Sequence, residues 1–416
     1  MKMLFLYWLF LSPPADTLRL EECYQKAMEQ FPLSKQIKLY DNILELRLKN
    51  LNSKYLPEPT LNAQTTYQSD VTVFPLSFPG VSIPQQHKDG YQVSLLANQL
   101  IYDFGVISKQ KDVEKAQMVI DKKSVEVELY KLKTQVNEAY FSVLLLQEKE
   151  RSLLLTDEDV RTKLSSIRSK VKNGTSLPSN ADILEAELLK IAQAKAETKA
   201  NKRSAIDVLS QLLNISLDES LNLEIPRDVS PAGSGSALKR PEYAAFDLSR
   251  KKLSRSIDLT SRRNLPKLSA FLQLSYARPG VNAFDNTFQK YYIAGLRASW
   301  TFWNWNTDNR DKEILRQQQS MIGAQEEAFT KNISIAAQKN LSEIDKLQEL
   351  IKLDHEIIAL RKKVTQQLSS QLDNGVVTSS EYLTELNAEH QAALTLESHK
   401  IQLIKTQKDH RITIGE

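Results

Sequence analysis

The 416-residue sequence predicts a mainly α-helical fold with a smaller β part, built as two repeats of one series: helix, two strands, very long helix, turn, helix. First, short features recur about 200 residues apart, such as the Asn-Gly pairs at 173–174 and 374–375. Second, segments that alternate apolar and polar residues, as strands do, precede each long segment. Third, the two long segments have helical periodicity and no proline. Because a unit of this kind often cannot bury its own apolar faces, the repetition bears directly on function.

Composition and the N-terminus narrow the class of protein. The 55 basic and 51 acidic residues leave a net charge of +4, which gives no basis for nucleic-acid binding. Cys23 is the only cysteine, so neither a disulfide nor a cysteine metal cluster is available, and we expect it to be a small core residue. Residues 1–15 have a basic start, a short apolar run and a small-residue exit, which predicts a secretory signal peptide cut near Ala15. No other segment reaches the length of a membrane-spanning helix.

The two repeats are expected over residues 16–221 and 238–416, joined by a linker over 222–237 that is rich in Pro, Gly and Ser. The first repeat is predicted to contain a helix broken at Phe31-Pro32, a β-hairpin over about 60–102, a long helix over about 105–172 and a return helix over about 180–213. The second is predicted to contain a helix from Leu238, a β-hairpin over about 267–303, a long helix over about 308–373 and a return helix over about 380–411. At ~1.5 Å per residue each long helix would measure roughly 100 Å, a length that indicates coiled-coil packing.

Each predicted strand has about ten residues, which suits a tilted transmembrane strand. Aromatic residues gather near the strand ends, where an interfacial girdle would lie. They are Tyr67, Phe74, Tyr91, Tyr102, Tyr291, Tyr292, Trp300, Phe302, Trp303 and Trp305. Two ordinary hairpins on a soluble core are the alternative, but the signal peptide and the duplication of the hairpin favour the membrane.

Four strands cannot close a barrel around a pore, and open edges cannot stay unpaired in lipid. Membrane-inserted hairpins therefore require several copies to share one barrel, with the apolar face outward and the polar face toward a water-filled lumen. Long antiparallel helices that continue the cylinder would make a tunnel. The predicted architecture thus indicates a conduit.

Several motifs resemble those of the TolC-type outer-membrane efflux protein family, and the resemblance covers about Thr17 to Arg411. The first helix, TLRLEECYQKAMEQFP, is similar to the amphipathic opening helix of the family. The segments IYDFGVISKQ and FWNWNTDNRD resemble its strand-to-helix corners, at Gly105 and at Asn306, where glycine is usual. LKRPEY resembles its Arg-Pro-acid motif, and both Asn-Gly pairs fit its helix tips.

The resemblance implies a homotrimer with a shared transmembrane β-barrel, four strands from each chain, that continues into a periplasmic α-helical barrel. It implies an outer-membrane location with a large periplasmic part, contact with outer-membrane lipid, and two partners, a periplasmic adaptor protein and an inner-membrane transporter of an efflux or type I secretion system. The competing interpretation is a periplasmic coiled-coil adaptor or a structural envelope protein without a pore. Adaptors usually show one helical hairpin flanked by Gly-rich β domains, and this sequence repeats its hairpin.

The candidate functional residues cluster at the helix tips. The turns, which the resemblance also makes adaptor contacts, are expected at Asn173, Gly174, Asn374, Gly375, Val376 and Val377. The acidic residues that follow, Asp182, Glu185, Glu381 and Glu385, are candidates for the periplasmic gate. Glu381 matches the first acid of a pair that constricts the pore in the family, whereas Thr384 occupies the second position. Three copies of Glu381 would form an acidic ring, but acids in the first turn of a helix also simply complement its dipole.

Arg297 falls on the polar face of its predicted strand, where it would either adjust the charge of the pore or form an ion pair at the extracellular end. The five histidines lack metal-ligand spacing and are expected on solvated faces. No phosphate-binding loop, nucleophile elbow or pair of catalytic acids occurs, so we expect no enzymatic activity, no catalytic residues and no cofactor.

Overall fold

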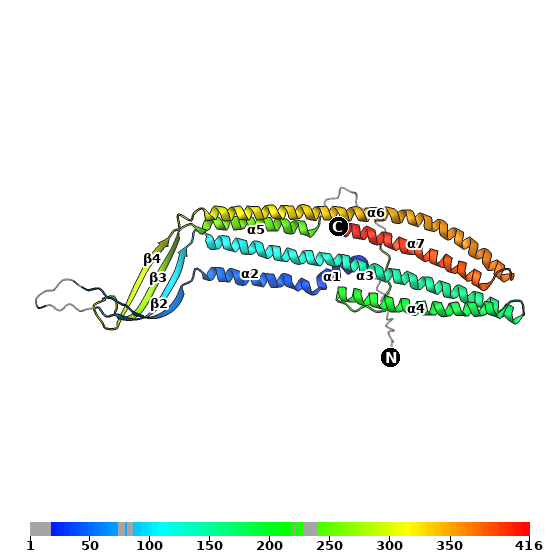
Figure 1. Cartoon of the computed structure of the whole chain (residues 1–416), viewed down its shortest axis with the longest axis horizontal. Helices are drawn as coiled ribbons and strands as arrows, with labels where there is room; N and C mark the ends of the chain where they lie inside the picture. The colour runs from blue at the N-terminus through cyan, green and yellow to red at the C-terminus, as the bar shows by residue number, and fades with distance from the viewer. Residues whose placement is uncertain (1–17, 74–79, 81–85, 220, 228–238) are drawn as a thin grey trace, which may run out of the picture. The chain divides into compact units, whose positions relative to one another are not determined.

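The computed structural model describes residues 18–73, 80, 86–219, 221–227 and 239–416 (Figure 1). The predicted signal peptide and most of the predicted linker lie outside these residues. The described chain forms two compact units. We call residues 37–123 and 244–326 the sheet unit, and residues up to 36, 124–243 and 327–416 the helical unit. The prediction of a mainly helical chain with a small antiparallel sheet is confirmed.

The sheet unit contains four antiparallel strands in the order β1-β2-β3-β4. They are β1 (Glu58–Tyr67), β2 (Asp89–Tyr102), β3 (Lys267–Arg278) and β4 (Gln289–Ser299). Each predicted hairpin supplies two neighbouring strands, and β2 pairs with β3 to join the hairpins. Within the described sheet, β1 and β4 each have only one neighbour, so two edges have unpaired backbone groups.

The register separates an apolar face of the sheet from a polar one. One row across the strands consists of apolar side chains, namely Leu61, Leu95, Leu274 and Tyr292. The adjacent row points to the opposite face and is polar, namely Asn62, Ser94, Ser275 and Tyr291. Successive side chains of a strand alternate between faces, so each face continues along the sheet, but Leu96, Phe271 and Ile293 also lie on the polar face. The large side chains of the apolar row are 42–73% exposed.

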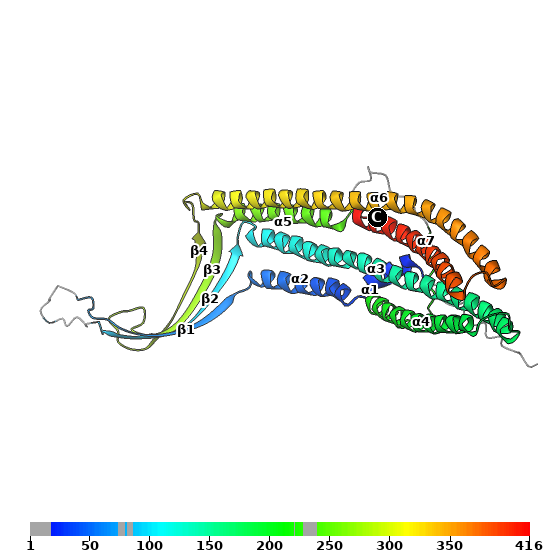
Figure 2. The ribbon, with the colours of Figure 1, turned by 45° about the vertical axis from the view of Figure 1, so that its right-hand side comes forward.

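Four helices accompany the sheet unit. They are α2 (Gln36–Ser53), α5 (Pro241–Arg263), the first part of α3 (Val106–Lys172) and the first part of α6 (Thr307–Asp373). Figures 1 and 2 show α2 beside α3 and α5 beside α6. Ion pairs between Arg47 and Glu114 and between Arg250 and Glu326 hold these pairs together. None of the helices in the described ranges is long and apolar enough to cross a bilayer.

Both corners between a strand and a long helix use two consecutive left-handed residues. Phe104 and Gly105 have φ of 52° and 86°, and Trp305 and Asn306 have φ of 55° and 62°. Asn306 thus adopts the conformation that Gly105 adopts, which asparagine tolerates better than most residues. The corner geometry is therefore kept without the usual glycine.

The helical unit consists of α1 (Leu20–Gln30), a short 3₁₀ turn (Pro32–Lys35), α4 (Pro178–Leu213), α7 (Ser379–Ile414) and the second parts of α3 and α6. Its larger core joins α1, α3, α4 and α7, and Cys23 is fully buried in it. Burial raises the pKa of the Cys23 thiol to about 12, as expected of an inert core residue. Leu223 is also buried here and bridges Leu18, so the first residues of the predicted linker are packed.

Candidate functional site: the tips of the two helical hairpins

The two hairpins, α3–α4 and α6–α7, end in turns of the same geometry. Gly174 and Gly375 both have φ of 70°. The amide of Thr175 donates to the Lys170 carbonyl at 2.9 Å, and the amide of Val376 donates to the Gln371 carbonyl at 2.9 Å. No atom lies within 4 Å of a Cβ built on either glycine, so the left-handed conformation alone explains the residue type.

A separate apolar core lies behind these turns and joins both hairpins. Its buried members are Val160, Leu164, Ile167, Ala181, Leu184, Ile191, Leu372, Tyr382, Leu383 and Leu386. They come from all four helices of the tips. Burial raises the pKa of the Tyr382 hydroxyl to about 12, which keeps the side chain neutral. Apolar packing therefore already holds the two hairpins of one chain together.

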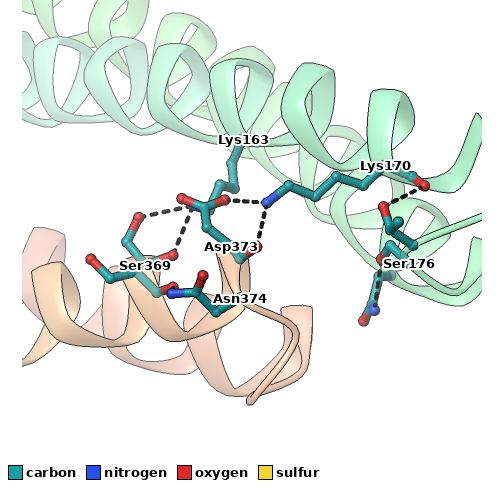
Figure 3. A network of polar contacts seen from close by, with 9 residues as sticks. Lys163, Lys170, Ser176, Ser369, Asp373 and Asn374 are labelled. Carbon is teal, nitrogen blue, oxygen red and sulfur yellow. Dashed lines mark hydrogen bonds and ion pairs between the residues drawn. The ribbon is translucent and has the colours of Figure 1, made fainter. Parts of the chain in front are cut away.

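A polar network beside this core links α3 to the end of α6, and Figure 3 shows it. Lys163 of α3 donates to Asp373 Oδ2 at 3.0 Å, and to the Ser369 hydroxyl and carbonyl at 2.9 and 3.2 Å. Lys170 donates to Asp373 Oδ1 and to its carbonyl oxygen at 2.8 and 2.9 Å. Asp373 thus receives two cations from the other hairpin.

Two further features stabilise the opposite charges of this network. The side chain of Lys163 is only 9% exposed, and its Nζ lies 5.1 Å from the centre of the Tyr382 ring, so its charge also has a cation–π partner. Although burial favours the neutral acid, hydrogen bonds from Lys170 and Lys163 lower the pKa of the Asp373 carboxyl below its usual value. Asp373 is therefore ionised at neutral pH and bound on both oxygens.

Glu381 caps its own helix. Its Oε2 accepts hydrogen bonds from the amide and the hydroxyl of Thr378 at 2.8 and 2.9 Å, while its amide donates to the Thr378 hydroxyl at 3.3 Å. This is a capping box, and the bond from the Thr378 amide lowers the pKa of the Glu381 carboxyl. The local geometry thus corresponds to the helix-dipole alternative for Glu381.

The other acidic candidates divide into paired and exposed residues. Glu185 accepts two bonds from Arg168 at 2.7 and 3.2 Å, within the first hairpin. Glu385 accepts two bonds from Arg361 at 2.9 Å, within the second hairpin. Asp182 is exposed. Hence the structure does not bring the four acids together within one chain.

The turn residues occupy different environments. Val376 is 72% exposed, whereas Val377 packs against the tip core. Asn180 at the start of α4 accepts a bond from the Ser379 amide at 3.1 Å, so it caps the other hairpin. The exposed apolar side chains at the two turns are Leu177 and Val376.

Lys163, Lys170 and Asp373 were not predicted from the sequence. One signal was available: Asp373 ends a long helix, where a carboxylate opposes the helix dipole unless cations neutralise it. The expectation for the histidines is wrong in three cases. The His390 side chain is only 18% exposed, and its Nε2 lies 3.1 Å from Asp159 Oδ2. His410 is buried, and His399 Nδ1 lies 2.6 Å from Asp354 Oδ2. In the part of the chain that the structure describes, no group of three or more His, Cys, Asp or Glu side chains could hold a metal ion.

Arg297 lies at the end of β4 nearest the helices, opposite Ser269. Both alternatives for Arg297, a charge in the pore and an ion pair at the extracellular end, stay predictions. Among the described residues Arg297 forms no ion pair, and its guanidinium lies 5.1 Å from the centre of the Phe271 ring.

Comparison with known proteins gives a likeness of structure only. No family model and no curated protein sequence matches the chain. The solved structure of CusC, described with transmembrane channel formation, has 12% identity and a TM-score of 0.68, over 95% of this chain and 92% of that one. The Campylobacter jejuni CmeC outer membrane channel has 14% identity and a TM-score of 0.65, over 95% and 85%.

The Neisseria gonorrhoeae MtrE outer membrane channel in its open state has 15% identity and a TM-score of 0.66, over 95% of this chain and 89% of that one. The chain has the fold of these outer-membrane channels. The likeness extends over nearly the whole length of both partners, so the resemblance seen in the sequence is confirmed at the level of fold.

Proposed function

We propose that the chain is the outer-membrane component of an export system. Three copies form a passive channel-tunnel that gives substrates of an inner-membrane transporter an exit across the periplasm and the outer membrane. A periplasmic adaptor contacts the helix tips, and the chain itself catalyses no reaction. The observation that carries this proposal is the likeness to outer-membrane channels along 95% of the chain.

The sheet supports insertion into a membrane by several copies. One face is apolar and exposed, and both edge strands lack a partner within the described sheet. Backbone groups on an open edge cannot be left unpaired in lipid, so β4 of one copy must pair with β1 of the next. Exposed aromatic residues near the helices supply one interfacial girdle, namely Tyr102, Trp300, Phe302, Trp303 and Trp305.

The tips support a closed resting state of the tunnel. In each chain, the bonds from Lys163 and Lys170 to Asp373 tie the second hairpin to the first. An opening movement that separates the hairpins must break these bonds. We assign this network as the latch of the periplasmic end, with Asp182, Glu185, Glu381 and Glu385 as charged residues around it.

The experiment that tests the function uses the full-length protein expressed in a Gram-negative host. We expect it in the outer-membrane fraction, as a detergent-stable trimer that dissociates on heating, and we expect it to form ion-conducting pores in planar bilayers. Asp373→Asn removes the carboxylate of the latch and should raise the single-channel conductance. Lys172→Gln removes an exposed charge at the equivalent position of the first hairpin, the last residue of α3, and serves as the matched control that should leave the conductance unchanged.

A protein found as a monomer that dissolves without detergent, with no conductance, would exclude the channel and favour the adaptor. A conducting trimer that Asp373→Asn leaves unchanged would retain the channel but exclude the latch.

A further inference from the structure

Phe271 and Gly295 form a close contact on the polar face of the sheet. They are paired across β3 and β4, and the Phe271 ring lies over the glycine. A Cβ added at Gly295 would come within 2.9 Å of Phe271 Cζ, so a larger residue would displace the ring. Glycine leaves room for the aromatic side chain in this position.

Arg297 continues this arrangement. It lies two residues beyond Gly295 and therefore on the same face, and its guanidinium sits 5.1 Å from the Phe271 ring centre. Cation–π contact with an aromatic face orients a guanidinium without neutralising it. Because Arg297 has no carboxylate partner among the described residues, its charge remains available to a solute.

The polar face has few other charges. Within the four strands only Glu58, Lys267 and Arg297 carry charge on this face, as the register shows. All three lie at strand ends next to helices. The single acid, Glu58, is on β1, the edge strand that in the proposed barrel pairs with β4 of the next copy. This end of the face therefore has one more cation than it has acids.

We propose that Arg297, held by Phe271, makes the lumen selective for anions where the shared barrel meets the helices. This rests on the proposed channel, in which the polar face lines the lumen and copies of Arg297 form a ring. A ring of like charges in a narrow aqueous pore concentrates ions of the opposite sign. The solutes favoured at this point are those with carboxylate or phosphate groups.

Lys290 provides a matched control. It lies on the same strand as Arg297, with the same charge and on the opposite face, and it is exposed. If Arg297 acts through the lumen, neutralising Lys290 has no effect on ion selectivity. If only the total charge of the protein matters, the two substitutions have equal effects.

The test measures reversal potentials of single pores of the full-length protein in a KCl gradient. Block of the current by inorganic tripolyphosphate is measured on the same pores. The tripolyphosphate is added on the side of the bilayer opposite the helices. We expect Arg297→Gln to lower the permeability ratio of Cl⁻ to K⁺ by roughly twofold or more and to weaken the block. Arg297→Lys should retain most of both, and Lys290→Gln should match the unmodified protein.

Two outcomes would overturn the proposal while leaving the channel intact: normal pores whose selectivity and block Arg297→Gln does not change, or equal effects of Arg297→Gln and Lys290→Gln. If the unmodified protein forms no pores, the proposed function fails first. The two failures are thus distinguishable.

Discussion

The tips of the two hairpins share one turn geometry and differ in how their helix ends are stabilised. In the second hairpin, α7 starts with a capping box between Thr378 and Glu381. In the first hairpin, α4 starts with Leu177 and Pro178 and has no side-chain cap. At the helix ends that precede the turns, the first hairpin is instead the better stabilised one. The first hairpin ends α3 with Lys170 and Lys172, which suit the helix dipole, whereas the second ends α6 with Asp373, which opposes it.

The difference shows that the two hairpins are not interchangeable. At the end of α6, Lys163 and Lys170 of the first hairpin neutralise Asp373 and so offset its unfavourable interaction with the helix dipole. The end of α3 needs no such help. We infer that the first hairpin supports the second, so that the second is the one whose order depends on contact with its neighbour.

The largest expected effect comes from a pair of positions equivalent in the two tips. Leu383 is buried in the tip core, and Asp182, the corresponding residue of α4, is exposed. Leu383→Ala should lower the local stability of the tip by about 2–5 kcal/mol because it leaves a cavity. Asp182→Ala should change it by less than about 0.5 kcal/mol. Hydrogen exchange of tip peptides in the detergent-solubilised protein measures both, and equal effects would contradict the assignment of the core.

Removing the buried cation is the next largest change. Lys163→Met should cost about 1–2 kcal/mol, since it removes charged hydrogen bonds to a carboxylate that is itself partly exposed. Faster exchange should appear at the end of α6 more than at the end of α3. Lys172→Met, at an exposed lysine, is the control and should leave exchange at the end of α6 unchanged. Faster exchange at both helix ends alike would refute the proposed dependence of the second hairpin on the first.

The N-terminal cap can be removed from α7 and a cap can be added to α4. Thr378→Ala should destabilise the start of α7 by about 1 kcal/mol, and Thr378→Ser should retain the cap. Leu177→Thr should slow exchange at the start of α4, because Leu177 already has the extended backbone of an N-cap. If Leu177→Thr does not slow exchange there, the missing cap is not what distinguishes the two helices.

Lowering the pH from 7 to about 5 should have the smallest effect on the stability that Asp373 contributes. The folded-state pKa of Asp373 is lowered, so its contribution is complete above the ordinary carboxyl value of 3.8 and is lost as the pH falls through the lower folded value. The difference in exchange between the unmodified protein and Asp373→Asn should therefore be constant from pH 7 to about 5 and shrink below 3.8. A difference that disappears already at pH 6 would assign the effect to another group.

Much of the fold followed from periodicity. Long helices were predicted over about 105–172 and 308–373, and the structure has helices over Val106–Lys172 and Thr307–Asp373. Long segments with helical periodicity and no proline leave little ambiguity about where a helix runs. The strands were recognisable because each alternates apolar and polar residues over about ten positions. The break at Phe31-Pro32 was also evident, whereas the second strand of the second hairpin ends at Ser299, before the expected 303.

The candidate site was less predictable for a physical reason. Local patterns place Glu381 and Glu385 at the start of a helix but do not state their partners. Glu385 pairs with Arg361 on the preceding helix, and Asp373 pairs with lysines more than 200 residues away. Such pairs depend on how separate hairpins pack, which no single periodicity encodes. Arg297 was recognisable because strand alternation alone assigns it to a face.

The number of strands has a consequence for assembly. Each chain supplies an even number of strands that alternate in direction, so β1 and β4 run opposite to each other. In the proposed assembly, the seam where one copy meets the next can then form ordinary antiparallel pairs in a ring of any size. Strand direction alone therefore does not fix the number of copies, which we expect the packing of helices between neighbouring copies to decide.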